Sequence, residues 1–399
     1  MTATLVPTGD TWTIGAPRLL AGLAQDRSLD LGAHLATHGP LPAIDRARLI
    51  GLVDAIALAG RGGAGFPFGA KLRALAGPPR EVIVNGSESE PASRKDRTLL
   101  RRTPHLALDG AVAVAAALGG RHVTIAVHDP AAAETLRRAI AERRDPLRIR
   151  VELVAGGFVG GEARAVRRAV RGGPARPPGR RVHLTSQATL LANAETFAQV
   201  AIALRLGPVR FRDTGTSAEP GTTLLTVGGA VTRPGVVEAP LGTPLGIVLS
   251  AAGAASQPRA VIIGGYHGSW HPPMPGLRLS HADGRLGAGV VLVLDGNTCA
   301  LGELARVAAW LAAQSAGQCG PCRFGLPALA DDVAALLVGL PAPAALRHAQ
   351  AVTGRGACRH PDGAARFVTS ALAVLSDEIE RHRLGGCGRP VLGQLAVPA

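Results

Sequence analysis

Short β-branched runs alternate with helical patterns between residues 81 and 154, and this alternation is the strongest constraint on the fold. Strands that alternate with helices build a parallel sheet with helices packed on its faces. In such sheets, ligands bind beyond the carboxyl ends of the strands. The apolar spacing predicts strands at 81–84, 122–127 and 147–154 and helices at 106–118 and 131–142. We therefore expect an α/β domain with a Rossmann-like parallel sheet and a ligand site just after residue 84.

A glycine-rich stretch at residues 60–71, GRGGAGFPFGAK, precedes the first of these strands. Glycine permits positive φ and lets the backbone approach a ligand, and successive N–H groups in such a loop can converge on an anion. Lys71 ends the stretch and is one of only two lysines in the chain, the other being Lys95. The stretch indicates a phosphate cradle, although in a chain with 52 glycines it could also be a plain turn. We expect helices at 44–59 and 72–76 on either side of it.

Three further segments place polar residues at the ends of predicted elements. The first strand runs into an acidic segment, NGSESEP at 85–91, which is followed by Lys95 and Asp96. Residues 156–171 open with glycines and continue as an arginine-bearing helix. Residues 189–196, TLLANAET, are expected to begin a helix that runs to about residue 206. The acidic segment lies where the sheet is expected to bind its ligand.

Composition narrows the class of protein. The chain has 399 residues and a formal net charge of +14, carried almost entirely by arginine. Such a charge can attract nucleic acid, an anionic membrane or an acidic protein, or it can reflect a general bias toward Ala, Gly, Arg and Pro. Aromatic residues make up only 3%, which leaves little for base stacking, so we expect no nucleic-acid partner. We find no secretory signal or membrane span and expect a cytoplasmic protein.

The second half of the chain changes character twice. Residues 222–272 and 289–294 read as short strands around one helix at 243–252, which is typical of a β-grasp-like module. From residue 301 the pattern is helical, with helices expected at 301–315, 326–337, 344–352 and 363–383. The domains we predict are an N-terminal arm (1–40), an α/β ligand-binding domain (41–215), a β-grasp-like domain (220–298) and a helical bundle (299–399).

Three cysteines fall on loops that connect the predicted helices of the bundle. Cys319 and Cys322 form a C-x-x-C pair, and Cys358 lies between two later helices. Three thiols on such loops can converge on a metal or an iron–sulfur centre, or they can be unrelated core residues. Cys299 and Cys387 are isolated in the sequence; we expect Cys299 in the core and Cys387 exposed to solvent.

Five of these segments, at 60–71, 85–96, 158–166, 189–196 and 315–325, resemble motifs of one family in the same order. The family is the flavin-bearing, NADH-oxidising subunit of complex I (NADH:quinone oxidoreductase), with its relatives in NAD-linked hydrogenases and formate dehydrogenases. Residues 222–272 resemble the SLBB β-grasp domain of these proteins. The resemblance covers roughly residues 49–374. It implies an FMN-binding domain followed by an SLBB domain and an iron–sulfur bundle.

The resemblance also implies roles for individual residues. The FMN phosphate would meet the glycine loop, with Lys71 nearby, and two residues, Phe66 and Glu90, would lie near the nicotinamide nucleotide. The residues implied to bind cofactor are Arg61, Gly62, Gly63, Ala64, Gly65, Phe66, Lys71, Asn85, Glu88, Glu90, Gly161, Glu162, Asn193 and Thr196. The implied metal ligands are Cys319, Cys322 and Cys358, with His360 and Asp362 as candidates for a fourth.

The chain departs from the family pattern at both ends of the expected electron path. A tyrosine, a glutamate and an aspartate of the family are replaced here by Phe158, Ala163 and Ser87. Fewer side chains are therefore expected to contact the nicotinamide nucleotide. Ala316 replaces the first ligand cysteine, so the expected cluster is a 4Fe-4S or 3Fe-4S centre with an incomplete cysteine set.

The resemblance implies an FMN-dependent oxidoreductase, an NADH dehydrogenase-like component of an electron-transfer system. It would move electrons between a nicotinamide nucleotide or another donor and a ferredoxin-like or quinone-linked partner through an iron–sulfur centre. The alternative is a non-catalytic flavin-binding or assembly subunit that has lost NADH oxidation.

Overall fold

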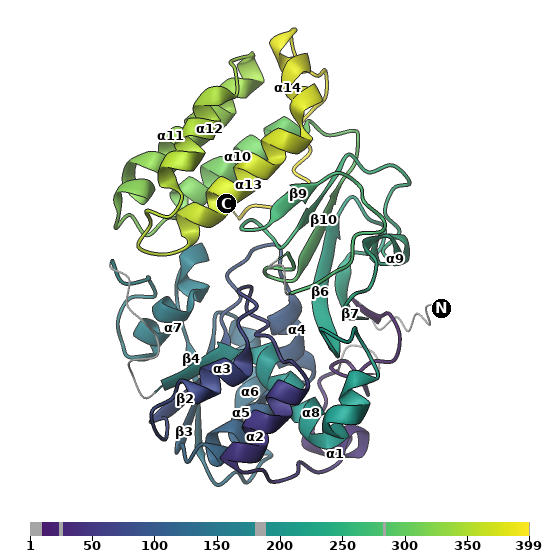
Figure 1. Cartoon of the computed structure of the whole chain (residues 1–399), viewed down its shortest axis with the longest axis vertical. Helices are drawn as coiled ribbons and strands as arrows, with labels where there is room; N and C mark the ends of the chain where they lie inside the picture. Colours follow the sequence, from purple (N-terminus) through teal and green to yellow (C-terminus); the bar gives the residue numbers. More distant parts are fainter. Residues whose placement is uncertain (1–9, 24–26, 180–188, 282–284, 399) are drawn as a thin grey trace.

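The computed structural model describes residues 10–23, 27–179, 189–281 and 285–398, and it contains three layered parts (Figure 1). A parallel α/β unit lies at one end, a helical bundle at the other, and a mixed sheet beside and between them. Of the predicted arm, residues 1–9 and 24–26 lie outside the described residues. In the part of the chain that is described, no helix combines the length and the apolar character needed to cross a membrane.

The α/β unit contains the predicted parallel sheet. Its strands are β2 (Glu81–Gly86), β3 (His122–Val127), β4 (Arg148–Leu153) and β5 (Thr189–Asn193), in the order β4-β3-β2-β5. All three pairings are parallel. The helices of the unit are α2 (Arg46–Ala55), α3 (Phe68–Arg73), α4 (Lys95–Arg102), α5 (Pro104–Ala117), α6 (Pro130–Ala141), α7 (Ala163–Val170) and α8 (Ala194–Arg212). The alternating pattern is confirmed, with strand and helix bounds close to those predicted from the sequence.

Two local predictions in this unit are wrong. Residues 189–193 are not helical; they form β5, whose backbone pairs with β2 from Glu81 to Asn85, and the helix begins only after Asn193. Tertiary pairing overrides the helical propensity of such a short apolar run. The helix predicted at 72–76 begins earlier, so that Lys71 lies within α3 rather than before it. Gly207, with φ 69°, kinks α8 at the following proline.

The second part is a mixed six-stranded sheet. Its strands are β1 (Thr11–Thr13), β6 (Thr222–Gly229), β7 (Gly235–Pro240), β8 (Ala260–Ile263), β9 (Ser269–His271) and β10 (Val290–Leu294), in the order β1-β7-β6-β10-β8-β9. The helix α9 (Leu245–Ala251) packs against it through Leu245 and Val248. The short strands around one helix that the sequence predicts are present, and the assignment to a β-grasp-like module of the SLBB class stays a prediction.

The N-terminal segment joins this second sheet. β1 pairs in parallel with β7, and the chain after it is fixed by the buried carboxylate of Glu238. This carboxylate accepts the backbone N–H groups of Arg18, Leu19 and Leu20 at 2.9–3.0 Å. The helix α1 (Leu31–His38) follows, as the helical content of the arm predicts. The arm thus ties the α/β unit to the second sheet.

The third part is the helical bundle. Its helices are α10 (Ala300–Ala313), α11 (Leu326–Ala335), α12 (Pro343–Val352), α13 (His360–Val374) and α14 (Ser376–Arg383). The single helix predicted at 363–383 is wrong, because the backbone leaves the helical region at Leu375 and a new helix starts with Asp377 and Glu378 in its first turn. Acidic residues are favoured in the first turn of a helix, so a new start at this position is consistent with the sequence.

Candidate cofactor site

The glycine-rich stretch forms a closed loop in front of α3. The N–H of Gly60 donates to the carbonyl of Phe66 at 2.9 Å, and that of Phe68 donates to Leu58 at 2.8 Å. Gly63 and Gly65 adopt φ of 94° and 60°, which L side chains rarely adopt. The plain-turn interpretation explains the closure but not why the loop is packed so tightly against other segments.

Neighbouring segments approach this loop closely on two sides. A Cβ on Gly62 would lie 3.3 Å from the Cβ of Asn193, at the carboxyl end of β5. A Cβ on Gly65 would lie 2.7 Å from the carbonyl oxygen of His281, which belongs to the second sheet domain. The loop therefore lies between the ends of the parallel strands and the β-grasp-like module, where a ligand of an α/β sheet is expected.

Arg61 and Thr196 hold the loop in place. The N–H of Arg61 donates to Thr196 Oγ1 at 2.9 Å, and the buried guanidinium reaches the carbonyl of Thr222 at 3.4 Å and the carboxylate of Glu195 at 3.8 Å. Burial lowers the pKa of Arg61, although Glu195 opposes the shift. Both residues thus fix the position of the glycine-rich loop.

Lys71 lies on α3 and is directed at the end of β5. Its Nζ donates to the carbonyl of Leu191 at 2.9 Å, and burial lowers its pKa. One of its three donors is therefore used by the backbone. The others remain able to meet an anion at the cradle.

A buried polar network links the acidic segment to α8. Lys95 Nζ contacts Asp96 Oδ1 at 2.8 Å, Glu195 Oε2 at 3.1 Å and Asn193 Oδ1 at 3.4 Å. The Asn193 amide in turn donates to Asp96 Oδ2 at 2.7 Å. Burial alone would lower the pKa of Lys95, but Asp96 and Glu195 outweigh it and the pKa is raised. Lys95 thus stays charged at the centre of the network.

Asn85 and Glu88 have different roles from each other. Asn85 Nδ2 donates to the carbonyl of Gly161 at 3.0 Å, which joins the end of β2 to the segment before α7. Glu88 instead holds its own segment: it accepts from Ser93 Oγ at 2.6 Å, from the N–H of Asp96 at 3.0 Å and from Arg97 Nε at 3.1 Å.

Gly161 and Glu162 close the far side of the site. A Cβ on Gly161 would lie 2.3 Å from Ser89 Oγ, so this position needs glycine for the two segments to meet. Glu162 caps α7 by accepting the N–H groups of Arg164 and Ala165, and its other oxygen pairs with Arg164 Nε at 2.8 Å.

The residues present fit a flavin nucleotide. Ser87 Oγ and His128 Nε2, which follow β2 and β3, are buried polar atoms that have no hydrogen-bond partner among the described residues. Buried polar groups are normally satisfied, so the strand ends offer polar contacts to a ligand. The glycine cradle and Lys71 suit its phosphate, while the unpartnered Ser87 and His128 suit the polar edge of its ring. Sequence reasoning missed His128, although its place directly after a strand could have indicated it.

The two residues implied to lie near the nicotinamide nucleotide, Phe66 and Glu90, differ in their exposure to solvent. The side chain of Phe66 is 52% exposed at the tip of the cradle. Glu90 is buried, and its two oxygens accept the N–H of Tyr266 at 2.8 Å and that of Ala92 at 3.3 Å. Burial raises the pKa of Glu90 to about 7. The carboxylate thus joins the acidic segment to the loop between β8 and β9.

Two of the three predicted metal ligands lie in contact in the bundle, and the third is close by. Cys319 Sγ and Cys322 Sγ are 3.5 Å apart, and the N–H of Ala357, the residue before Cys358, points at the sulfur of Cys319. Backbone N–H groups point at every sulfur: Ala357 and Cys322 at Cys319, Gly317 at Cys322 and His360 at Cys358. Such N–H donors favour thiolates that hold an iron–sulfur cluster. Burial raises the pKa of Cys322 to about 11 and also raises that of Cys358.

The candidates for a fourth ligand are engaged elsewhere. His360 Nε2 lies 2.8 Å from the carbonyl of Leu311 and Nδ1 lies 2.9 Å from His267 Nε2, so both ring nitrogens have partners. The two oxygens of Asp362 accept from Gly354 and Arg359. In this conformation both side chains are held by other partners. Among the described residues, the donors at this place are therefore the three thiols, with Ala316 at the position of the fourth.

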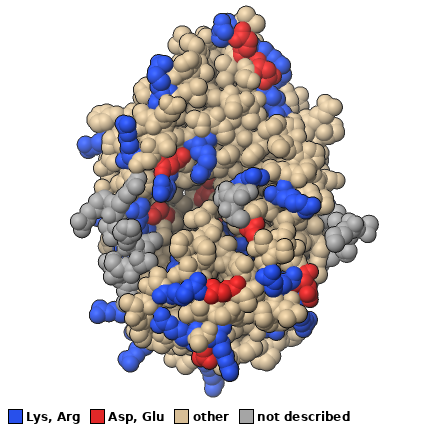
Figure 2. Space-filling model, viewed as in Figure 1, with Lys and Arg blue, Asp and Glu red and all other residues tan. Residues whose placement is uncertain are grey.

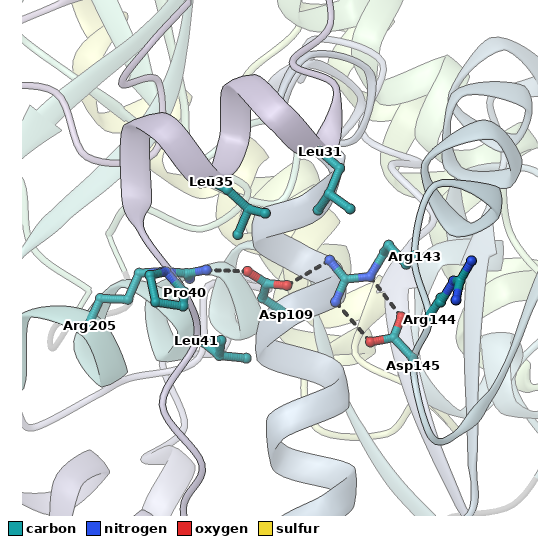
Figure 3. A pocket seen from close by; sticks show the side chains of 9 residues that line it. All are labelled: Leu31, Leu35, Pro40, Leu41, Asp109, Arg143, Arg144, Asp145 and Arg205. Carbon is teal, nitrogen blue, oxygen red and sulfur yellow. Dashed lines mark hydrogen bonds and ion pairs between the residues drawn. The ribbon is translucent and has the colours of Figure 1, made fainter.

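A pocket of about 250 Å³ lies away from these residues (Figure 3). Its central acid, Asp109, is paired with Arg143 and Arg205, and Arg143 is paired again with Asp145. His34 adds a third contact to Asp109 at 2.8 Å. Because its buried charges are matched by one another, we interpret this pocket as an ion-pair cluster that joins α1 to α5 and α8. Figure 2 shows a hollow near the middle of the face seen in Figure 1, with basic and acidic side chains around it.

A glycine cradle at the ends of parallel strands, next to a three-thiol centre in a helical bundle, defines the class of iron–sulfur flavoprotein oxidoreductases. Comparison with known proteins agrees. Residues 53–202 match the family described as the Nuo51 FMN-binding domain, and residues 302–382 match the NADH-ubiquinone oxidoreductase-F iron–sulfur binding region. The chain belongs to this family of FMN-binding NADH-quinone oxidoreductase subunits and is an NADH dehydrogenase-like flavoprotein.

Individual relatives cover most of the chain. An NADH-quinone oxidoreductase subunit of this family from Streptomyces coelicolor is 31% identical over 376 residues, which is 85% of this chain and 84% of that protein. The corresponding protein of Mycobacterium tuberculosis is 31% identical over 378 residues, covering 85% of both chains. The crystal structure of an NAD⁺-reducing [NiFe]-hydrogenase in the H₂-reduced state superposes with a TM-score of 0.78 at 28% identity over 85% of this chain. The chain spans 63% of that hydrogenase chain.

Proposed function

We propose that this chain is a redox subunit that holds FMN at the carboxyl edge of the parallel sheet and an iron–sulfur cluster at the three thiols. Electrons would pass between the two on the way from a nicotinamide nucleotide to a partner redox protein. FMN supplies the chemistry that links a two-electron donor to one-electron carriers. The residues of the chain bind it, orient it and position the cluster beside it.

One observation carries this proposal: the segment that closes the candidate flavin site also packs on the helical bundle. Gly161 accepts from Asn85 at the flavin side, and Glu162 caps α7 and pairs with Arg164. Phe158, one turn earlier, packs on Trp310 and His360 of the bundle, with ring centroids 5.1 and 5.7 Å apart. The same short segment therefore contacts the candidate flavin site and the bundle that holds the thiols.

A second function, a flavin-binding subunit without NADH oxidation, is favoured by the contacts of Glu90. Its carboxylate is held by two backbone N–H groups, and Gly265 packs against it so closely that a Cβ there would lie 2.5 Å from Glu90 Oε2. In that case Glu90 would be a structural joint between two domains and not a nucleotide contact.

Anaerobic titration separates the two functions. The protein, purified without oxygen and reconstituted with FMN, is titrated with NADH and, in parallel, with NADPH while the visible spectrum is recorded. Bleaching of the flavin absorbance by either nucleotide supports the redox subunit. Bound flavin that is bleached by dithionite but by neither nucleotide supports the non-catalytic subunit, and no bound flavin at all contradicts both.

We further propose that the partners are other subunits of a multi-subunit assembly, of the ferredoxin-like or quinone-linked kind. The relatives named above belong to an NADH-quinone oxidoreductase and to an NAD⁺-reducing hydrogenase. The net charge of +14 would favour an acidic partner surface. The five cysteines are all free in the structure, which suits the reducing conditions of the cytoplasm.

A further inference from the structure

Two cysteines that stand alone in the sequence lie side by side in the structure. Cys299 precedes α10, and Cys387 follows α14 in the C-terminal segment. Together with Glu378 and His382 of α14 they form a group whose four ligand atoms all lie within 4.8 Å of one another. The prediction that Cys299 is buried is confirmed, whereas Cys387 is half-buried and not exposed. We propose that Cys299, His382, Cys387 and Glu378 form a structural zinc site, separate from the iron–sulfur thiols.

The donor set fits zinc. Zn²⁺ in structural sites takes four ligands in a tetrahedron, drawn from thiolates, imidazoles and carboxylates. Glu378 and His382 are four residues apart on one helix, so both side chains lie on the same face. His382 Nε2 lies 3.4 Å from Cys299 Sγ. Two sulfurs, one nitrogen and one carboxylate oxygen thus converge from three separate segments of the chain.

The surroundings of the group orient its ligands. His382 Nδ1 lies 3.0 Å from the carbonyl of Leu337; a carbonyl only accepts, so Nδ1 carries the proton and Nε2 presents its lone pair to the sulfurs. Metal-binding histidines commonly donate their second nitrogen in this way. The N–H of Gly302 donates to Cys299 Sγ at 3.3 Å and so holds this sulfur in place.

The charges around the group also match a metal centre. Two thiolates, one carboxylate and Zn²⁺ carry a net charge of about −1, counting formal charges. The fully buried Glu378 is flanked by Arg259 and Arg389, each with a nitrogen 3.5 Å from Oε2. These arginines would offset that charge.

The chain is shaped to bring Cys387 to this place. Gly385, Gly386 and Gly388 flank it with φ of 117°, 112° and 69°, so the backbone reverses sharply after α14. Beyond the reversal the tail is bonded to the bundle: the N–H of Cys299 donates to the carbonyl of Pro390 at 2.7 Å. Further on, the carbonyl of Ala396 accepts from the hydroxyl of Tyr266, whose own N–H holds Glu90. Zinc at the reversal would fix a tail that supports the flavin side of the molecule.

Metal analysis of variants tests the site. Zinc and iron are measured by mass spectrometry of the elements in the anaerobically purified full chain and in Cys387→Ser, His382→Gln and Cys358→Ser. We expect one zinc per chain, lost in Cys387→Ser and His382→Gln but kept in Cys358→Ser, which loses iron instead. Both ligand variants are at the rim of the group, and Cys358→Ser is the matched control for removing a buried thiol.

Cobalt titration of metal-free protein provides a readout that does not depend on variants. Co²⁺ bound by two thiolates in a tetrahedron gives intense sulfur-to-metal absorbance, which added Zn²⁺ would abolish. The proposal is wrong if zinc persists in Cys387→Ser and His382→Gln, if it disappears only with Cys358, or if neither zinc nor the cobalt absorbance is found. A Cys299–Cys387 disulfide, seen as a mass two daltons lower in the unreduced peptide pair, would also overturn it.

Discussion

The candidate flavin site (the flavin end) and the site of the three thiols (the cluster end) differ in completeness. At the first the buried charged groups around Lys95 have partners, and at the second one expected ligand is missing. At the flavin end, Lys95 has three partners, and Asn193 and Glu195 tie the sheet to the acidic segment. At the cluster end, three thiols converge, but alanine stands at position 316. A nucleotide held by many weak contacts tolerates the loss of one contact while the buried frame beneath it stays intact, whereas a cluster held by a few covalent bonds depends on each of them. We therefore expect the flavin end to be robust and the cluster end to be labile.

Removing the cation at the centre of the flavin end should have the largest effect on stability. In Lys95→Met, the buried carboxylate of Asp96 loses its positive partner, and that of Glu195 loses the nearer of two, the other being Arg61. Breaking a buried pair by removing one partner costs about 3–5 kcal/mol. We expect the free energy of unfolding in urea to fall by that amount, and FMN occupancy to fall with it.

The control for this prediction is an exposed ion pair on the same domain. Arg73 pairs with Asp54, and both side chains are about half exposed. Because such pairs contribute only about 0–1 kcal/mol, Arg73→Ala should change the unfolding free energy little. If Lys95→Met were no more destabilising than Arg73→Ala, the flavin end would not depend on this network.

At the cluster end, restoring the missing thiol should make the cluster less labile and so reduce the difference between the two ends. Ala316→Cys adds a fourth thiol beside Cys319 and Cys322, and we expect iron retention after exposure to air to rise several-fold. Cys358→Ser should lose most of its iron while keeping FMN. Ala313→Cys, which adds a thiol at the exposed end of α10, is the control and should leave the iron content unchanged. Equal air sensitivity of Ala316→Cys and the unmodified protein would mean that the cluster already has a fourth ligand.

The sequence predicted the flavin end better than the cluster end for physical reasons. Glycine loops and strand ends are local patterns, so the cradle and the acidic segment could be identified from spacing. The strand at 189–193 could not, because only its pairing with β2 decides between strand and helix. The partners of His360 and the proximity of Cys299 to Cys387 depend on tertiary packing between distant segments. Such contacts leave no trace in local spacing.

The tight packing of the glycine-rich loop can be tested by adding a single methyl group to it. Gly65→Ala forces a left-handed conformation and places Cβ against the carbonyl of His281. Left-handed strain and overpacking together amount to about 2–4 kcal/mol. We expect lower FMN occupancy and a lower free energy of unfolding, measured by flavin release and urea denaturation. Gly77→Ala, where a Cβ meets nothing within 4 Å and φ is not positive, should be close to neutral. Equal behaviour of the two variants would contradict a tightly packed cradle.

The smallest expected effect concerns Glu90, which joins the flavin end to the second sheet. Its pKa is raised by burial from 4.5 to about 7, so between these values the folded protein holds a proton that the unfolded chain has lost. The free energy of unfolding should therefore fall as pH rises from about 4.5 to about 7, with the penalty fully present above pH 7. A shift from 4.5 to about 7 corresponds to a change of at most about 3 kcal/mol, and the backbone N–H groups of Tyr266 and Ala92 keep it from being larger.

Glu90→Gln should reduce this slope by the share that Glu90 contributes, while Asp96, whose pKa is also raised by burial, keeps its own share. The neutral amide leaves one backbone N–H without an acceptor, which lowers stability equally at every pH, so the readout is the slope and not the absolute value. Urea denaturation from pH 4.5 to pH 8 measures it, with Glu134→Gln, an exposed carboxyl on α6, as the control that should keep the slope. An unchanged slope in Glu90→Gln would mean that Glu90 is ionised throughout this range. The charged carboxylate of Glu90 would then be present at neutral pH where the acidic segment meets the second sheet. The comparison of the flavin end with the cluster end would then also have to include this sheet.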